Sequence, residues 1–219
     1  MAALAERFYI KSSSFTWLKH LIIPGLLLVS VALLLGSISY PYWTMHLDAP
    51  QYDYRDGLNI EVYINEMKGK DPEFDELREL NNLNHYIGMR QLDDAAEFER
   101  SIAIPSLLIF IVLLVVAAVA FLRNYRYAWL LTLPPFAFPF VFVADLYYWL
   151  RDSGQNLDPA APFSSSIKPF TPTMIGEGVV GQFSTAAQLG TGWYLALGAS
   201  LCIVAVWGIL IAKSFTKKA

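Results

Sequence analysis

Hydrophobic positions along the chain form four long segments, at 18–39, 101–122, 127–150 and 193–212. Each holds about 20 residues or more, which at a rise of about 1.5 Å per residue matches a hydrocarbon core about 30 Å thick. A helix satisfies every backbone amide within its own segment, as such a core requires. The pattern therefore predicts a four-helix transmembrane bundle. We expect the first segment to be a retained span rather than a cleaved signal peptide, because its apolar stretch is longer than the usual hydrophobic region of a signal.

The stretch between the first two spans, residues 40–100, carries two patterns of alternating apolar and polar residues. One runs from Tyr42 to Leu47 and the other from Leu58 to Ile64, with turn-forming residues between them. Alternation with period two is typical of strands that bury one face. We therefore expect a two-stranded antiparallel ribbon. Such a ribbon is only marginally stable in water and needs a cover.

A helix after the ribbon is the natural cover. Asp71-Pro72-Glu73 has the residues of a helix start, with an Asp cap and Pro at the first helical position. Apolar residues then recur at near-helical spacing, and Gly88 is a plausible end. Asparagine is a poor helix former, so we expect the helix to weaken or break at Asn81, Asn82 and Asn84.

The second long loop, residues 151–192, is rich in Pro, Gly, Ser and Thr and has little periodicity. Gly176, Gly178 and Gly181 suggest close approach of backbones rather than regular structure. Its apolar residues predict an ordered loop packed on the first. The expected fold is thus an all-α membrane bundle with a small α+β extracytoplasmic cap.

Basic residues predict the orientation of the chain in the membrane. The tails at 1–17 and 213–219, the start of the first span and the turn at 123–126 hold eight Lys and Arg residues and one acid. Residues 40–100 hold fourteen acids and six bases. The positive-inside rule therefore places both termini in the cytoplasm and both long loops outside.

Composition excludes several classes of protein. The net charge is −3, only 16% of the residues are charged, and there is no basic stripe, so a nucleic-acid binder is excluded. The single cysteine, Cys202, excludes a disulfide framework. His20 is the only histidine in or near a span, so a haem held by two histidines is not expected. No hydrolase or phosphate-loop motif is present, and we expect a non-enzymatic protein.

A histidine–methionine pair is the sharpest candidate for chemistry. On a helix His85 and Met89 are four residues apart and share a face, with Asn81 one turn before. Imidazole and thioether together suit Cu(I). Met45 or His46 could join the pair, but a strand points these two neighbours to opposite faces. The alternative is that the methionines, including Met67, fill the core and that His85 is hydrogen-bonded to Asn or backbone.

Asp145 is the second candidate because it lies inside the outer end of the third span. A carboxylate at that depth must face the bundle, water or a cation. It is either a ligand for a proton or a metal ion, or an anchor that accepts hydrogen bonds from Arg151 or from Gly154-Gln155-Asn156. The acidic residues of the first loop could gather cations or dock a basic partner, although such runs are more often simply solvated.

Several stretches resemble a family of bacterial membrane proteins found beside accessory genes for nitrous oxide reductase and copper delivery. They are Trp43–Tyr52 (WTMHLDAPQY), Gly57-Leu58, Leu83–Met89 (LNHYIGM), Ala144–Trp149 (ADLYYW) and Gly154–Pro162 (GQNLDPAAP). The resemblance implies service to a copper enzyme at the outer face of a bacterial inner membrane. It carries over His85, Met89, Asp145, Asn156 and Asp158 as motif positions. The chain departs from the pattern at Gln155, where a histidine is expected.

Two functions follow as expectations. The first is an accessory protein that binds or delivers copper for a copper enzyme. The second is an auxiliary structural subunit of a larger membrane oxidoreductase or monooxygenase complex. In both the partners are the lipid bilayer and another membrane protein.

Overall fold

The computed structural model describes residues 21–52, 57–125, 127–180 and 182–216. The predicted N-terminal tail, Arg126 and the last two lysines lie outside these residues. The chain forms two compact units: Met1–Leu35, Leu107–Phe138 and Ala196–Ala219 make up the first, and Gly36–Ser106 with Pro139–Leu195 make up the second.

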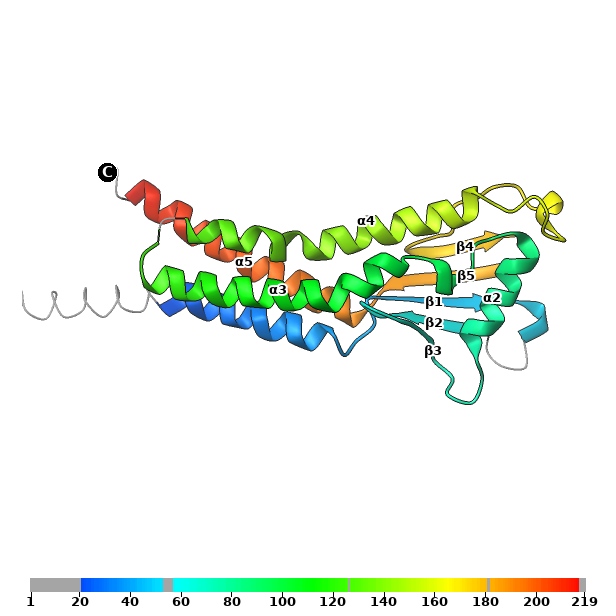
Figure 1. Ribbon diagram of the computed structural model, residues 1–219, viewed down its shortest axis with the longest axis horizontal. Coiled ribbons are helices and arrows are strands. Elements are labelled where there is room, and N and C mark those ends of the chain that lie inside the picture. Colours follow the sequence, from blue (N-terminus) through cyan, green and yellow to red (C-terminus); the bar gives the residue numbers. More distant parts are fainter. Residues whose placement is uncertain (1–20, 53–56, 126, 181, 217–219) are drawn as a thin grey trace, which may run out of the picture. The chain divides into compact units, whose positions relative to one another are not determined.

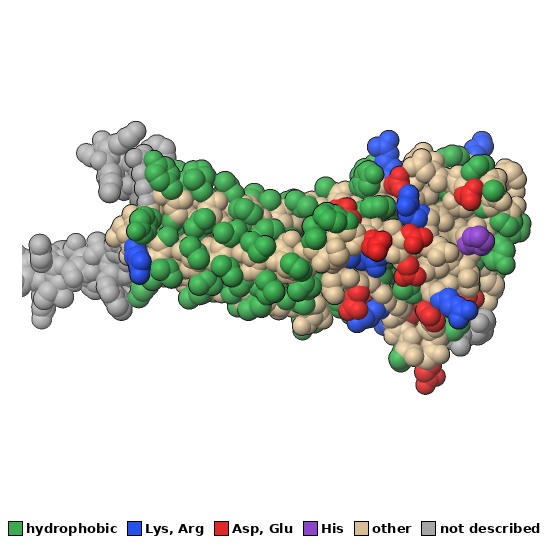
Figure 2. Space-filling model, in the orientation of Figure 1, with side chains coloured by type: hydrophobic (Ala, Val, Ile, Leu, Met, Phe, Trp, Pro, Cys, Tyr) green, Lys and Arg blue, Asp and Glu red, His purple; other side chains and the backbone are tan. Residues whose placement is uncertain are grey.

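Long helices dominate the chain (Figure 1). They are α3 (Glu97–Leu122), α4 (Leu133–Gln155, preceded by a 3-10 turn at Ala128–Thr132) and α5 (Thr191–Thr216). In the first predicted span, the described residues Leu21–Ser37 form a shorter apolar helix. The stretches Glu97–Leu122, Ala128–Gln155 and Thr191–Ala212 are long and apolar enough to cross a membrane. Hydrophobic side chains cover the surface of the helices in the face shown in Figure 2. These are the features of a membrane protein.

Within the first unit, buried hydroxyl groups join neighbouring helices. The Ser30 hydroxyl donates to the Ala199 carbonyl oxygen at 3.1 Å, so the Leu21–Ser37 helix contacts α5. The Ser200 hydroxyl donates to the Phe136 carbonyl oxygen at 3.0 Å, which joins α5 to α4. Small polar residues let membrane helices approach closely, and each bond removes an unsatisfied group from hydrocarbon.

The second unit, called the sheet unit below, is built on a five-stranded antiparallel sheet in the order β3-β2-β1-β5-β4. The strands are β1 (Trp43–Asp48), β2 (Leu58–Val62), β3 (Met67–Gly69), β4 (Gly176–Val180) and β5 (Phe183–Leu189). The predicted ribbon is confirmed, because β1 and β2 pair with Met45 opposite Ile60. The ribbon is extended on both sides, by β3 and by a hairpin from the second loop.

That hairpin corrects the prediction that the second loop has no regular structure. β5 pairs with β1 and with β4, and Gly178 stands opposite Thr185. The strands are rich in small residues, so their conformation depends on neighbours rather than on propensity. A Cβ at Gly178 would collide with the Thr173 side chain. The close approach expected at this glycine therefore occurs within a strand.

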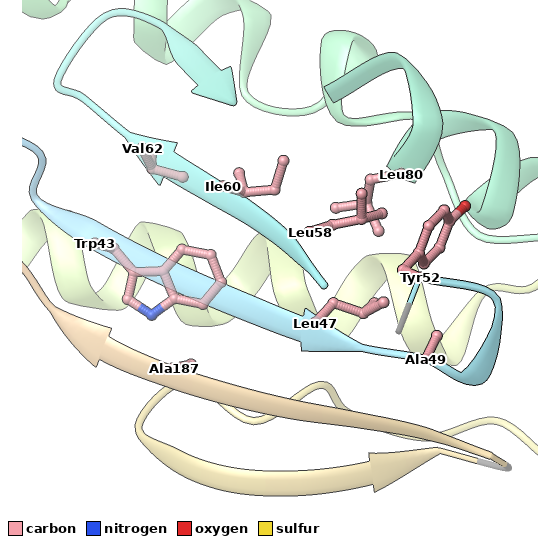
Figure 3. Packing of buried hydrophobic residues seen from close by; sticks show 9 residues of the cluster. All are labelled: Trp43, Leu47, Ala49, Tyr52, Leu58, Ile60, Val62, Leu80 and Ala187. Carbon is pink, nitrogen blue, oxygen red and sulfur yellow. The ribbon is translucent and has the colours of Figure 1, made fainter. Parts of the chain in front are cut away.

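One face of the sheet is covered by α2 (Glu76–Ile87). The core between them is drawn in Figure 3, with Leu80 of α2 facing Leu58 and Ile60 of β2. Phe142, Leu146 and Leu150 of α4 pack against the same cluster. Burying each large apolar side chain contributes about 1.5–3 kcal/mol, so this cluster is the main source of stability for the sheet unit.

The helix α2 begins at Glu76, later than the predicted start at Asp71-Pro72-Glu73, and the Glu76 side chain folds back on the residues before it. Its carboxylate accepts hydrogen bonds from the backbone N–H of Asn59 (2.7 Å), Lys70 (2.5 Å) and Asp71 (2.8 Å). Asp75 is the actual N-cap and accepts from the Arg78 N–H at 3.0 Å. Glu76 is only 3% exposed and ties β2, the end of β3 and α2 together.

Candidate functional site

The segment Asn84–Met89 forms the C-terminal cap of α2. Gly88 ends the helix as predicted, in the left-handed conformation with φ 83°. The Gly88 N–H donates to the His85 carbonyl oxygen at 3.3 Å, and the Met89 N–H donates to the Asn84 carbonyl oxygen at 2.8 Å. These two bonds define a Schellman motif. Met89 thus lies beyond the helix, and the interpretation that His85 and Met89 share a helical face is wrong.

Asparagine side chains hold the chain that follows this cap. Asn81 accepts from the Leu92 N–H at 2.7 Å and donates to Asp93 at 2.8 Å. The Asn84 amide donates to the Arg90 carbonyl oxygen at 3.3 Å. The helix continues through Asn81, Asn82 and Asn84, contrary to the expected break. Because Asn81 and Asn84 are buried and bonded to the returning chain, their low helix propensity is offset by tertiary contacts.

The second loop docks on the cap through backbone groups. The Asp158 N–H donates to the Gly88 carbonyl oxygen at 2.8 Å, and the Phe163 N–H donates to the Tyr86 carbonyl oxygen at 3.0 Å. Asp158 also accepts from the Ala160 N–H at 2.9 Å, which forms a local turn. Asn156 donates to the Asp152 carboxylate at 2.6 Å. The polar groups of Asn156 and Asp158 therefore hold the loop in position.

A cavity of about 220 Å³ lies on the helix-covered side of the sheet. Its walls are mostly apolar side chains from α2, the C-terminal turns of α4 and the strands. Three methionines line it: Met45 from β1, Met67 from β3 and Met89 from the chain after the cap. Two of the predicted ligand residues, Met45 and Met89, are thus brought to one cavity.

His46 and His85, the two histidines predicted as ligands, lie outside this cavity. His85 is exposed, and its ring lies 6.2 Å from the Tyr86 ring. His46 is on the other face of the sheet from Met45, as strand alternation predicts, and lines an open groove of about 470 Å³. Its Nδ1 is 3.0 Å from Oδ1 of Asn59. Neither imidazole lines the methionine cavity.

Asp145 is half-buried on α4. Its electrostatic neighbours are Glu99 of α3 and the Trp149 indole. The side chains predicted to anchor it bond elsewhere, because Gln155 donates to Thr171 at 3.3 Å and Asn156 donates to Asp152. The Gln155 and Asn156 side chains therefore do not anchor Asp145.

An ion pair and a stacked guanidinium fasten the C-terminal end of α4. Arg90 lies 3.3 Å from the Asp152 carboxylate, and its guanidinium carbon is 5.6 Å from the centre of the Trp149 ring. Cation–π contacts of this kind hold the guanidinium over the ring face. The chain after the α2 cap is thereby attached to α4.

Sequence reasoning missed two buried polar groups of the second unit. One is Glu76, described above. The other is Tyr42, whose hydroxyl lies 2.7 Å from Ser37 Oγ and whose ring lies 5.0 Å from that of Phe142. Burial raises the pKa of Tyr42 to about 12. Neither residue had a local sequence signal, since acids and tyrosines are common throughout this loop.

Among the residues that the structure describes, no three His, Cys, Asp or Glu side chains come together to hold a metal ion. The soft donors that line the cavity are the thioethers of Met45, Met67 and Met89, and thioethers bind ions such as Cu(I). No known protein-family model matches the chain, and no curated protein is similar enough to match it.

Proposed function

We propose that this membrane protein is a non-enzymatic accessory protein that binds Cu(I) at the outer face of the membrane and delivers it to a copper enzyme. Met45 and Met89, with Met67, are the proposed ligands. The observation that carries this proposal is that all three methionines line one cavity. Thioethers hold Cu(I) without a charge and without a proton, which suits an apolar cavity and a cargo that must be released.

The proposal includes the arrangement of the chain in a bacterial inner membrane. Four spans, with both termini in the cytoplasm, put the sheet unit outside. The support is the clustering of basic residues at the tails and at the 123–126 turn, together with the acidic surplus of residues 40–100. Acidic and basic side chains gather over the sheet unit in Figure 2, as expected of a unit in water.

A Cu(I) titration of the purified full-length protein, with a chromogenic chelator as competitor, tests the ligands. The triple variant Met45→Leu, Met67→Leu and Met89→Leu keeps the side-chain volume but removes every cavity thioether. We expect micromolar or tighter binding in the wild type and its loss in this variant. The matched controls His85→Ala and His46→Ala are expected to bind as the wild type. Binding that survives the triple variant and disappears with His85→Ala contradicts the proposed site.

A second function, auxiliary subunit of a larger membrane complex, is favoured by one observation. The edge strand β4 leaves one side of its backbone open, and Val179 on it is 76% exposed. Exposed apolar edges of this kind pair readily with other chains. We expect co-migration with a partner after gentle extraction, lost in Val179→Lys and kept in the exposed loop control Ser165→Lys. Migration of the wild type alone would contradict this function.

A further inference from the structure

Besides the three methionines, many other apolar side chains line the cavity between the sheet and its helices. Its lining includes Leu83 and Ile87 of α2, Leu146 and Leu150 of α4, and Val180 and Phe183 of the β4–β5 hairpin. Protein interiors are normally packed to crystal density with few voids. The lining residues leave a partly open space of about 220 Å³, which is room for an apolar ligand.

The wall contributed by α4 indicates where that occupant comes from. Leu146, Trp149 and Leu150 line the cavity and belong to the outer turns of a helix that is long and apolar enough to span a membrane. Tyr147 and Tyr148 in the same turns are exposed, at 49% and 60%. Exposed aromatic residues at the end of a span are typical of the membrane–water interface. In the membrane arrangement proposed above, on which this inference rests, the cavity lies at the level where α4 leaves the hydrocarbon.

The size and chemistry of the cavity restrict the class of ligand. Pockets for compact organic ligands usually have volumes of about 300–1,000 Å³. The smaller volume here suits one slender chain better than a fused-ring molecule. The polar groups at the wall are few, and the Asn84 amide is already bonded to the Arg90 carbonyl oxygen. The described residues of the walls include no cationic side chain, so a charged headgroup is expected to stay outside the cavity.

We propose that this cavity takes one acyl chain of a membrane phospholipid. The acyl chain fills the space against the sheet, while the headgroup remains at the interface near the end of α4. This inference uses the volume of the cavity, whereas the copper proposal uses its sulfur atoms, so either can fail without the other.

The test uses full-length protein in phospholipid nanodiscs with a phosphatidylcholine probe that carries a diazirine at the end of one acyl chain. After photolysis, cross-links are mapped by mass spectrometry. We expect labelled residues in the sheet unit, at Leu83, Met89, Val180 or Phe183, besides those on the apolar helices. Labels confined to the apolar helices would overturn the proposal. Labelling of the sheet unit by a diazirine free fatty acid alone would also overturn it, because the source would then not be the bilayer lipid.

Filled-cavity variants make the result specific. Leu83→Phe with Leu146→Trp places extra atoms in the cavity, whereas Ala186→Leu adds comparable volume on the open face of the sheet. We expect at least a fivefold loss of sheet-unit labelling in the first and none in the second. The triple methionine-to-leucine variant is expected to keep the labelling while losing Cu(I). Equal labelling of wild-type and filled variants, each with an unchanged melting temperature, would place the acyl chain outside the cavity.

Discussion

The Met89 N–H donates to the Asn84 carbonyl oxygen at 2.8 Å. This bond keeps Met89 off the helical face that carries His85, although the two residues are only four apart in the sequence. It closes the cap of α2 and turns the chain at Gly88, so that Met89 lines the cavity while His85 stays on the exposed surface of the helix. The Asn-His-Tyr-Ile-Gly-Met stretch is thus first a helix cap. Of His85 and Met89, only Met89 lines the cavity that we propose as the copper site.

Gly88→Ala tests the cap. The residue has φ 83°, and an added Cβ would lie 2.7 Å from the Asp158 carbonyl oxygen. We expect a loss of about 2 kcal/mol or more in the free energy of unfolding, from the left-handed backbone and from the clash. Gly176→Ala is the matched control, because Gly176 has φ 95° and nothing within 4 Å. It is expected to lose about 1 kcal/mol. Equal losses, measured by thermal unfolding in detergent, would contradict the tight docking of the second loop.

Glu76→Gln tests the buried carboxylate. The amide would present a donor to backbone N–H groups that now donate to the carboxylate, so we expect a loss of about 3 kcal/mol in unfolding free energy. Glu73→Gln, at an exposed position in the same loop, is expected to change stability little. Denaturant unfolding of both variants makes the comparison. Similar stability of the two would mean that Glu76 does not join the strands to α2.

Tyr42→Phe removes the buried bond to Ser37, and we expect a loss of about 1–2 kcal/mol. The pH dependence is sharper. Because burial raises the pKa of Tyr42 from 10.0 to about 12, the unfolded chain ionises first as the pH rises above 10. The free energy of unfolding is therefore unaffected by this ionisation below pH 10. It falls by about 3 kcal/mol between pH 10 and 12. Unfolding curves of wild type and Tyr42→Phe at several alkaline pH values check this, and parallel pH profiles would contradict it.

Single cysteines test the orientation. In a Cys202→Ala background, Lys168→Cys in the second loop is expected to react with a membrane-impermeant maleimide on intact cells. Arg123→Cys in the turn after α3 should react only after the membrane is permeabilised. Both positions are exposed, so access to the reagent depends on the side of the membrane. The reverse pattern would put the sheet unit in the cytoplasm and remove the outer-face proposal.

Patterns with a strong local cause were predictable from the sequence. Strand alternation predicted β1 and β2 and put Met45 and His46 on opposite faces. The glycine at position 88 predicted the end of α2. Three of the four long apolar runs correspond to helices in the described residues that are long and apolar enough to span a membrane. Each of these depends on residues that are neighbours in the chain.

Features that depend on distant partners were not predictable. β5 forms because β1 offers it an edge, and its own small residues give no strand pattern. α2 starts at Glu76, and the carboxylate of that residue accepts from the Asn59 N–H of β2, a contact that no local pattern reveals. Met45, Met67 and Met89 line one cavity because of the way the sheet, α2 and α4 pack. No spacing in the sequence reveals this arrangement.

The most direct test of the copper proposal is X-ray absorption at the copper edge of the full-length protein loaded with one equivalent of Cu(I). The account predicts a first shell made of sulfur alone, which is lost in the Met45, Met67 and Met89 to leucine variant. A shell of imidazole nitrogen that persists in that variant would contradict it.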